Sequence, residues 1–209
     1  MSSHVSDSTT FSFTNPKCST QVFGDSSGRF LLGTVCAPMN RSVTLRPIQP
    51  ADQEFLYQVY ASTRTDELAV TDWNEEQKQS FLRMQFDAQH RHYQEHYAKA
   101  AFSVVLLNEQ PIGRLYVARW DHDIRIVDIA LLPQFRRSGI GSSLLQEILA
   151  EGEQSRKTVS IHVEQFNPAM RLYERLGFQK LGQVGVYFLM ELSPAKSIDR
   201  SASSPNSGS

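Results

Sequence analysis

The sequence predicts an α+β fold with a mixed sheet, and three observations support this prediction. Stretches of alternating apolar and polar residues, typical of strands, occur both before and after stretches with helical spacing. Three expected strands follow one another with only short turns between them, as in an antiparallel meander. The remaining strands are separated by helical stretches, which favours a sheet with parallel as well as antiparallel neighbours.

The folded domain is expected to begin with a strand over residues 43–48, where apolar and polar residues alternate. Pro50 then suits the first turn of a helix, and the apolar residues that follow recur at helical spacing. A loop is expected over residues 63–73, and a long helix with a polar second half over residues 74–97.

The second half of the domain begins with the meander and continues with alternating helices and strands. Gly177 is expected to end the last helix in a left-handed conformation, with Phe178 packing back onto it. The expected elements are strands over 102–107, 112–119 and 124–132, a helix to about Glu151, a strand over 158–163, a helix from Asn167-Pro168, and a last strand over 184–192.

One globular domain with two tails is the simplest organisation for 209 residues, of which 40% are hydrophobic and 21% charged. Residues 1–41 are rich in Ser and Thr without sustained periodicity, and we predict a disordered or loosely docked arm there. Residues 42–192 form the predicted domain, and residues 193–209 a disordered Ser/Pro-rich tail.

Composition excludes several classes of function. A net charge of −1 gives no reason to expect nucleic acid as a partner. No apolar run approaches the length of a membrane span, and no secretory signal pattern is present. Cys18 and Cys36 both lie in the arm, so we expect no disulfide scaffold, no metal site and a cytoplasmic protein. His92 and His96 are four residues apart on the expected helix and could bind one metal ion together. A polar helix face exposed to solvent is the better explanation for this pair.

A basic turn with two glycines, Arg136-x-x-Gly139-x-Gly141, opens the helix after the meander. The first amides of a helix lack intrahelical acceptors, and the helix dipole places positive partial charge there. A phosphate suits such a place. The glycines allow close approach and dihedrals that a Cβ would forbid. The turn therefore has the character of a pyrophosphate cradle, with a plain strand-to-helix turn as the alternative.

Two segments resemble the GNAT superfamily of acetyl-CoA-dependent N-acetyltransferases. The first is Asp128-Ile129-Ala130-Leu131-Leu132-Pro133 with the cradle turn, and the second is Ala169-x-x-Leu172-Tyr173-Glu174-x-Leu176-Gly177-Phe178. The resemblance covers about residues 43–192. It implies a mixed, mostly antiparallel sheet of six to seven strands flanked by helices, with acetyl-CoA as co-substrate and no metal.

The resemblance also assigns residues to the coenzyme. Backbone amides of the cradle would hold the pyrophosphate, and the strand before it would pair with pantetheine in a gap that opens beside residues 158–163. The family commonly has Asn where this chain has Phe166, so Asn167 either reaches pantetheine or caps the next helix. The implied residues are Ile129, Ala130, Leu131, Arg136, Arg137, Ser138, Gly139, Ile140, Gly141, Ser142 and Asn167.

Catalytic roles follow from the same resemblance. Tyr173 matches the tyrosine that protonates the departing thiolate, and its alternative is a core tyrosine. Asp128 is the first candidate for the general base and Glu164 the second, each with a carboxylate of no special role as the alternative. Acids and one aromatic that could attract a cationic amine lie where the family places its acceptor wall, or simply at a helix start: Asp66, Glu67, Asp72, Trp73, Glu75 and Glu76.

Together these features predict an N-acetyltransferase that moves an acetyl group from acetyl-CoA to a primary amine of a small molecule or peptide. We expect direct attack, because the predicted core has no cysteine to act as a covalent nucleophile. A transferase for a longer acyl-CoA and a non-catalytic CoA-binding module are the alternatives. The sequence leaves open whether the protein is a monomer or a homodimer.

Overall fold

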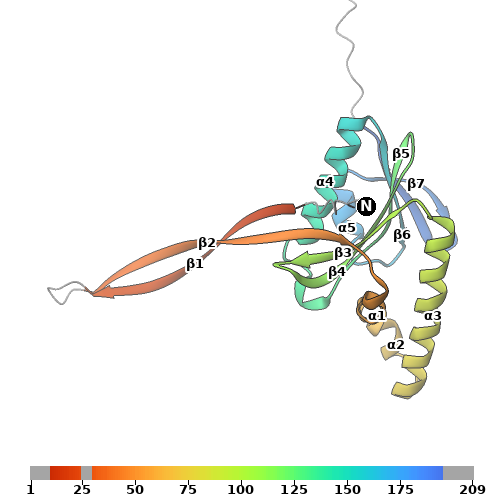
Figure 1. Cartoon of the computed structure of the whole chain (residues 1–209), viewed down its shortest axis with the longest axis horizontal. Helices are drawn as coiled ribbons and strands as arrows, with labels where there is room; N and C mark the ends of the chain where they lie inside the picture. The colour runs from red at the N-terminus through yellow and green to blue at the C-terminus, as the bar shows by residue number, and fades with distance from the viewer. Residues whose placement is uncertain (1–9, 25–29, 195–209) are drawn as a thin grey trace, which may run out of the picture. The chain divides into compact units, whose positions relative to one another are not determined.

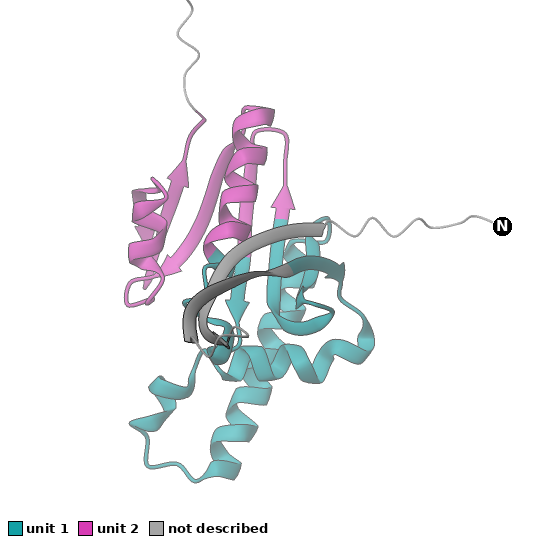
Figure 2. Ribbon diagram, turned by 90° about the vertical axis from the view of Figure 1, so that its left-hand side faces the viewer, with its two compact units in different colours: residues 1–117, 128–141 teal, residues 118–127, 142–209 magenta. Residues whose placement is uncertain are grey.

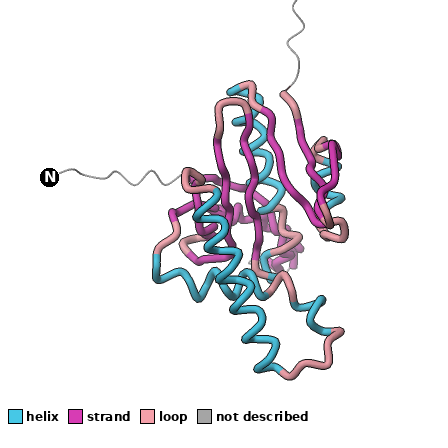
Figure 3. Tube along the Cα trace, turned by 90° about the vertical axis from the view of Figure 1, so that its right-hand side faces the viewer, coloured by secondary structure: helices cyan, strands magenta, loops and turns pink. Residues whose placement is uncertain are grey.

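A computed structural model describes residues 10–24 and 30–194, with side chains for residues 42–194. Figure 1 and Figure 3 show the helices and strands along the chain. The elements are β1 (Thr10–Gly24), β2 (Phe30–Pro47), η1 (Pro50–Asp52), α1 (Gln53–Ala61), α2 (Thr65–Ala69), α3 (Glu75–His96), β3 (Ala101–Leu107), β4 (Gln110–Arg119), β5 (Asp123–Leu131), η2 (Pro133–Phe135), α4 (Ile140–Ser155), β6 (Thr158–Glu164), α5 (Met170–Arg175), β7 (Gln179–Val184) and β8 (Tyr187–Leu192).

The strands hydrogen-bond in the order β1-β2-β3-β4-β5-β6-β8-β7. Only the β5–β6 pair is parallel among the pairs whose register is defined in the described chain. A mixed, mostly antiparallel sheet with helices confirms the predicted α+β class. Seven of the strands, β2 to β8, lie wholly or partly in the predicted domain, and β1 is an eighth contributed by the arm.

The chain forms two compact units, residues 1–117 with 128–141 and residues 118–127 with 142–209 (Figure 2). In the first unit, α1 and α3 bury apolar side chains against β3. Leu56, Tyr60, Phe86 and Val104 are each at most 3% exposed, and Phe86 contacts the rings of Tyr57 and Tyr60 at 5.9 Å. Asn74 caps α3 in a reciprocal box with Gln77, so the long helix begins where predicted.

The first strands extend the predicted one toward the N-terminus. β1 and β2 pair antiparallel from Thr10↔Thr44 to Gly24↔Phe30, and residues 43–47 of β2 pair with β3. Residues 1–9, 25–29 and most of the predicted C-terminal tail lie outside the described residues. The division into arm, domain and tail remains a prediction.

In the second unit, α4 packs against β6 over an apolar interface. Leu144, Leu145 and Ile148 of α4 and Val159 and Ile161 of β6 are all buried. A Cβ added at Gly152 would lie 2.5 Å from Val159 Cγ2, so only glycine permits this close approach of helix and strand.

Three elements differ from the prediction. The loop over 63–73 contains the short helix α2, whose five residues are too few to produce a periodic signal. The last strand is a hairpin, because Gly185 has φ +59° and turns the chain between β7 and β8. β7 is exposed throughout, so it lacks the apolar alternation that marks a strand. α4 also continues to Ser155, beyond the predicted end at Glu151.

Candidate active site

The cradle turn lies between the end of β5 and the start of α4, and two of its residues have left-handed backbones. Arg137 has φ +58° and Gly139 φ +87°. A side chain at Gly139 would meet no atom within 4 Å, so glycine is required there by conformation and not by space. Gly141 has no positive φ, and a Cβ there would make ordinary contact with Leu131 at 3.9 Å. The expected conformational need is therefore confirmed for Gly139 and was wrong for Gly141.

Several consecutive backbone N–H groups of this turn donate no backbone hydrogen bond among the described residues. Within the described chain, no backbone hydrogen bond is donated by the N–H groups of residues 137–141. Ile140 begins α4, a helix of 16 residues, so its positive dipole end coincides with these amides. Free N–H groups at such an end form an anion site of the kind that binds phosphate.

Arg136 donates hydrogen bonds from its backbone and side chain to other residues of the protein. Its N–H donates to Pro133 O at 3.2 Å, and its Nε donates to Leu131 O at 2.8 Å. Its Nη2 donates to the Ser62 carbonyl at 3.0 Å and to Ser62 Oγ at 2.9 Å. Arg136 thus fastens the turn to the end of α1, and Ser138 Oγ adds a bond to Phe135 O at 2.6 Å.

Gly113 of β4 approaches the strand that leads into the cradle. A Cβ on Gly113 would lie 2.3 Å from Ala130 O and 2.6 Å from Leu131 Cδ2. The Leu132 amide also donates to Ile112 O at 2.9 Å. Ala130 and Leu131 can therefore lie this close to β4 only because residue 113 is a glycine and has no side chain.

Parallel pairing of β5 with β6 covers only the first part of β5. It runs from Asp123↔Thr158 to Ile126↔Ile161, whereas β5 continues to Leu131. Ile129, Ala130 and Leu131, the residues expected to pair with pantetheine, fall beyond the paired register.

Asp128 forms an ion pair with Arg114 of β4. Arg114 Nη2 lies 2.7 Å from Asp128 Oδ2 and 3.1 Å from Gln89 Oε1 of α3. The Arg114 side chain is 4% exposed and that of Asp128 is 13% exposed. Burial opposes the charged guanidinium, but the neighbouring Asp128 carboxylate outweighs it and raises the pKa of Arg114.

Tyr116 lies buried beside this ion pair. Among the described residues, no group forms a hydrogen bond with its hydroxyl. Burial raises the pKa of Tyr116 to about 12, and the Arg114 charge opposes that shift in part. The side-chain Nε of Arg114 is also buried without a partner among the described atoms. No sequence pattern predicts this polar cluster, because Arg114 and Tyr116 lie among the buried residues in the middle of β4.

In the second unit, Tyr173 lies on α5 with its ring against Phe178. The ring centroids are 5.8 Å apart in an edge arrangement, and Tyr173 is 4% exposed. Gly177 has φ +96°, and Phe178 N donates to Tyr173 O at 3.1 Å. Gly177 N donates to Glu174 O at 3.1 Å, which completes the predicted left-handed helix end.

Glu164 and Asn167 lie on either side of the turn between β6 and α5. Tyr187 OH donates to Glu164 Oε1 at 3.2 Å. Asn167 N donates to Glu164 O at 3.0 Å, and Asn167 Oδ1 accepts the amide of Ala169 at 2.8 Å. The side-chain oxygen of Asn167 is therefore engaged in the turn before α5, whose N-cap residue is Ala169.

Comparison with known proteins places the chain in a family. The sequence profile of the acetyltransferase (GNAT) family matches residues 63–178. The chain belongs to the GNAT acetyltransferase family. The match spans the cradle turn and the segment around Tyr173, so the resemblance drawn from those motifs is confirmed.

Solved structures share the GNAT fold. PaiA N-acetyltransferase from Thermoplasma acidophilum, solved with coenzyme A, is 19% identical, with a TM-score of 0.54 over 72% of this chain and 98% of that one. PH1933 from Pyrococcus horikoshii OT3 is 20% identical, with a TM-score of 0.55 over 73% and 99%. The ribosomal-protein-S18-alanine N-acetyltransferase from Escherichia coli is 19% identical, with a TM-score of 0.50 over 76% and 97%. No protein of curated function matches.

Trp73 and the first turns of α3 line a shallow pocket in this GNAT protein. Trp73 and Phe81 meet edge to face at 5.0 Å, and they line a volume of about 500 Å³ with Glu76, Gln77 and Ser80. Arg64 pairs with Glu67, and Lys78 pairs with Glu75. Two of the acids expected to attract an amine, Glu67 and Glu75, are thus paired with cations of the protein itself.

Neither a metal-binding cluster nor a membrane-spanning helix occurs in the part of the chain that the structure describes. No three His, Cys, Asp or Glu side chains there are grouped to hold a metal ion. None of its helices combines the length and the apolar character needed to cross a bilayer.

Proposed function

We propose that this GNAT protein transfers an acetyl group from acetyl-CoA to a primary amine by direct attack. The observation that carries the proposal is the run of unbonded amides from residue 137 to residue 141 at the start of α4. These amides and the helix dipole suit the pyrophosphate of coenzyme A. Ser142 would add a donor in the first turn, and Arg136 would hold the turn in shape.

The acceptor must lose a proton before or during attack. A free alkylamine with a pKa near 10.4 is only about 0.04% neutral at pH 7, so a base that collects the proton accelerates the reaction. Taking a proton on Asp128 would weaken its ion pair with Arg114. Glu164 accepts a hydrogen bond from the Tyr187 hydroxyl. We keep both carboxylates, Asp128 and Glu164, as candidates for the base.

The amine nitrogen would form a bond to the thioester carbon, and the C–S bond would then break. The departing thiolate takes up a proton, for which we propose the Tyr173 hydroxyl as donor. An amide of residues 129–131 would stabilise the oxyanion between these two steps. No side chain is acylated in this scheme. We place the reaction in the cytoplasm, because both cysteines lie outside the predicted domain.

Two other activities compete with this proposal. A transferase for a longer acyl-CoA would use the same cradle, and a GNAT-fold module could bind CoA without turnover. The family match supports acyl transfer in general and does not select the acyl group.

Calorimetric titration of acetyl-CoA into the full chain tests the proposal, with Gly139→Glu as the variant. A carboxylate at the cradle repels phosphate, and φ +87° disfavours any side chain. We expect micromolar binding by the wild type, loss of binding in the variant, and acetylation in a screen of primary amines. A folded wild type that binds no acetyl-CoA would overturn the proposal, and binding without turnover would leave the CoA-binding module.

A further inference from the structure

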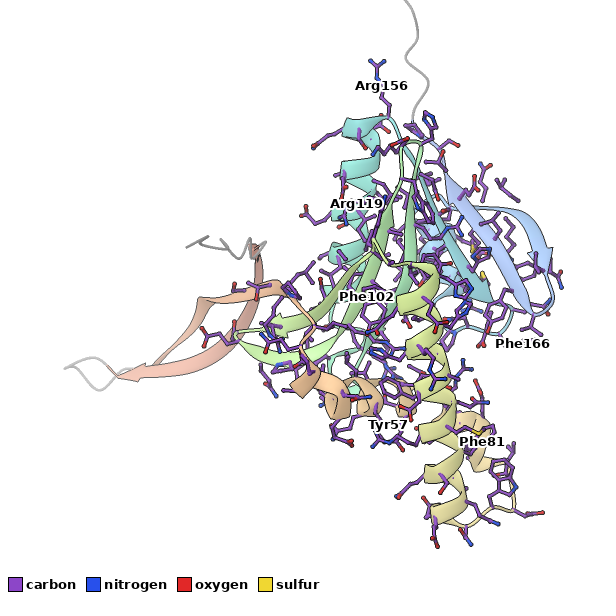
Figure 4. All side chains as sticks on the ribbon, turned by 45° about the vertical axis from the view of Figure 1, so that its right-hand side comes forward. Tyr57, Phe81, Phe102, Arg119, Arg156 and Phe166 are labelled. Carbon is purple, nitrogen blue, oxygen red and sulfur yellow. The ribbon has the colours of Figure 1, made fainter. Side chains whose placement is uncertain are left out.

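One end of the second unit carries a group of exposed apolar side chains. Phe166 is 94% exposed, Val184 74%, Val186 60% and Tyr187 41% (Figure 4 labels Phe166). Phe166 lies in the turn between β6 and α5, Val186 lies in the turn between β7 and β8, and Val184 and Tyr187 are the strand ends that flank that second turn. We call these four residues the apolar turn surface.

Hydrogen bonds hold the two turns side by side. Gln165 N donates to Val186 O at 2.9 Å, which continues the pairing of Glu164 with Tyr187. The bond from Asn167 N to Glu164 O closes the first turn around Phe166. The apolar turn surface is therefore built on fixed backbone.

The residue types are unusual for these positions. Turns exposed to water are normally formed by Gly, Asn, Asp, Ser or Pro, each for a backbone reason. Gly185 supplies the positive φ that the second turn needs, and the Val186 side chain is 60% exposed, so that side chain is not needed to form the turn. The Phe166 side chain is 94% exposed, so a small polar residue could form the first turn equally well. Exposed apolar groups that the fold does not require indicate a binding surface.

The only charged side chain in the two turns, residues 164–167 and 184–187, is Glu164. Its carboxylate accepts a hydrogen bond from Tyr187, whose ring belongs to the apolar turn surface. A carboxylate beside apolar side chains complements a ligand with a cation at one end and an apolar body.

We infer that the apolar turn surface binds the acceptor, and that the acceptor is a primary amine carried on an aromatic or branched apolar body. The ammonium group lies at Glu164 and the apolar body covers Phe166 and Val186. This inference rests on the proposed function, since it assigns the amine substrate of the same reaction.

Steady-state acetylation of two small amines by the full chain tests the inference. The probes are 2-phenylethylamine, which has an apolar body, and ethanolamine, which has none. The variants are Phe166→Ser and Val186→Ser. The control is Leu181→Ser, because Leu181 is 60% exposed like Val186 but lies outside both turns. The affinity of each variant for acetyl-CoA is measured by calorimetry.

We expect both turn variants to raise KM for 2-phenylethylamine by about tenfold, as loss of one well-covered apolar side chain would. Acetyl-CoA affinity, KM for ethanolamine and the Leu181→Ser enzyme should change less than twofold. An unchanged KM for 2-phenylethylamine, or a wild type that prefers ethanolamine, would overturn the inference.

Two further outcomes separate this inference from the proposed function. If acetyl-CoA binds but no amine is acetylated, the transferase proposal fails, and saturation-transfer NMR then decides the inference alone. Binding of 2-phenylethylamine that Phe166→Ser abolishes would uphold the surface, and absence of binding would overturn it. A wild-type dimer that Phe166→Ser dissociates in sedimentation would also overturn it, because the surface would then join two copies.

Discussion

Arg114 Nη2 and Asp128 Oδ2 lie 2.7 Å apart and form a buried ion pair between β4 and β5 in the first unit. Both residues precede the cradle turn in the chain, and Asp128 is one of the two candidate bases. Loss of either partner leaves the other charge without compensation in a largely buried position. A loss of activity on removing Asp128 would thus combine chemistry with folding, so stability has to be measured first.

Arg114→Met is expected to lower the free energy of unfolding by about 3–5 kcal/mol, because Asp128 then lacks its cation. The double variant Arg114→Met, Asp128→Leu should recover most of that loss. Urea unfolding followed by circular dichroism measures both. Arg119→Met is the control, since the Arg119–Glu151 pair is about 40% exposed on both sides and should be worth about 1 kcal/mol or less. Equal losses in the two single variants would contradict the importance of burial.

Tyr116→Phe should change the free energy of unfolding little at neutral pH. It should also reduce the loss of unfolding free energy that occurs at alkaline pH. The hydroxyl it removes is buried and makes no hydrogen bond in the described chain, so its loss is expected to cost little at pH 8. The pKa of Tyr116 is raised from 10.0 to about 12, so the unfolded chain ionises first as pH rises. This contribution to stability is full below pH 10 and is lost between pH 10 and 12.

Urea unfolding at pH 8 and pH 11.5 measures the effect. Between these pH values the wild type should lose about 2 kcal/mol more than Tyr116→Phe. Tyrosines other than Tyr116 are present in both proteins and cancel in the comparison. Parallel losses in the two proteins would show that Tyr116 is not shielded from water.

Gly113→Ala should destabilise the first unit and disturb the strand before the cradle. The added Cβ would lie 2.3 Å from the backbone oxygen of Ala130, which cannot move without moving β5. We expect a loss of about 2–4 kcal/mol in unfolding free energy and weaker acetyl-CoA binding. Gly182→Ala is the control, because its Cβ would meet nothing within 4 Å and its φ is not positive. Similar behaviour of the two variants would mean that β4 and β5 can separate locally.

Sequence alone predicted the elements whose signals are local. The capped start of α3, the meander and the left-handed Gly177 each depend on residues close together in the chain. The ion pair of Arg114 with Asp128 depends on residues 14 positions apart on two strands, and its partner Gln89 lies on α3. Burial of an arginine in an apolar strand leaves no periodic pattern. The hairpin of β7 and β8 was missed for a related reason, since β7 is exposed on all six residues.

Tyr173→Phe separates catalysis from coenzyme binding. Tyr173 is buried against Phe178, and phenylalanine keeps that ring contact while removing only the hydroxyl. If the hydroxyl protonates the leaving thiolate, kcat should fall about 100-fold with unchanged acetyl-CoA affinity, since general acid catalysis contributes about 10²–10⁴-fold. Steady-state kinetics and calorimetry on the same preparation measure the two quantities, with Tyr57→Phe of α1 as the control. An unchanged kcat would assign Tyr173 to packing alone, because the ring contact that remains is then sufficient for function.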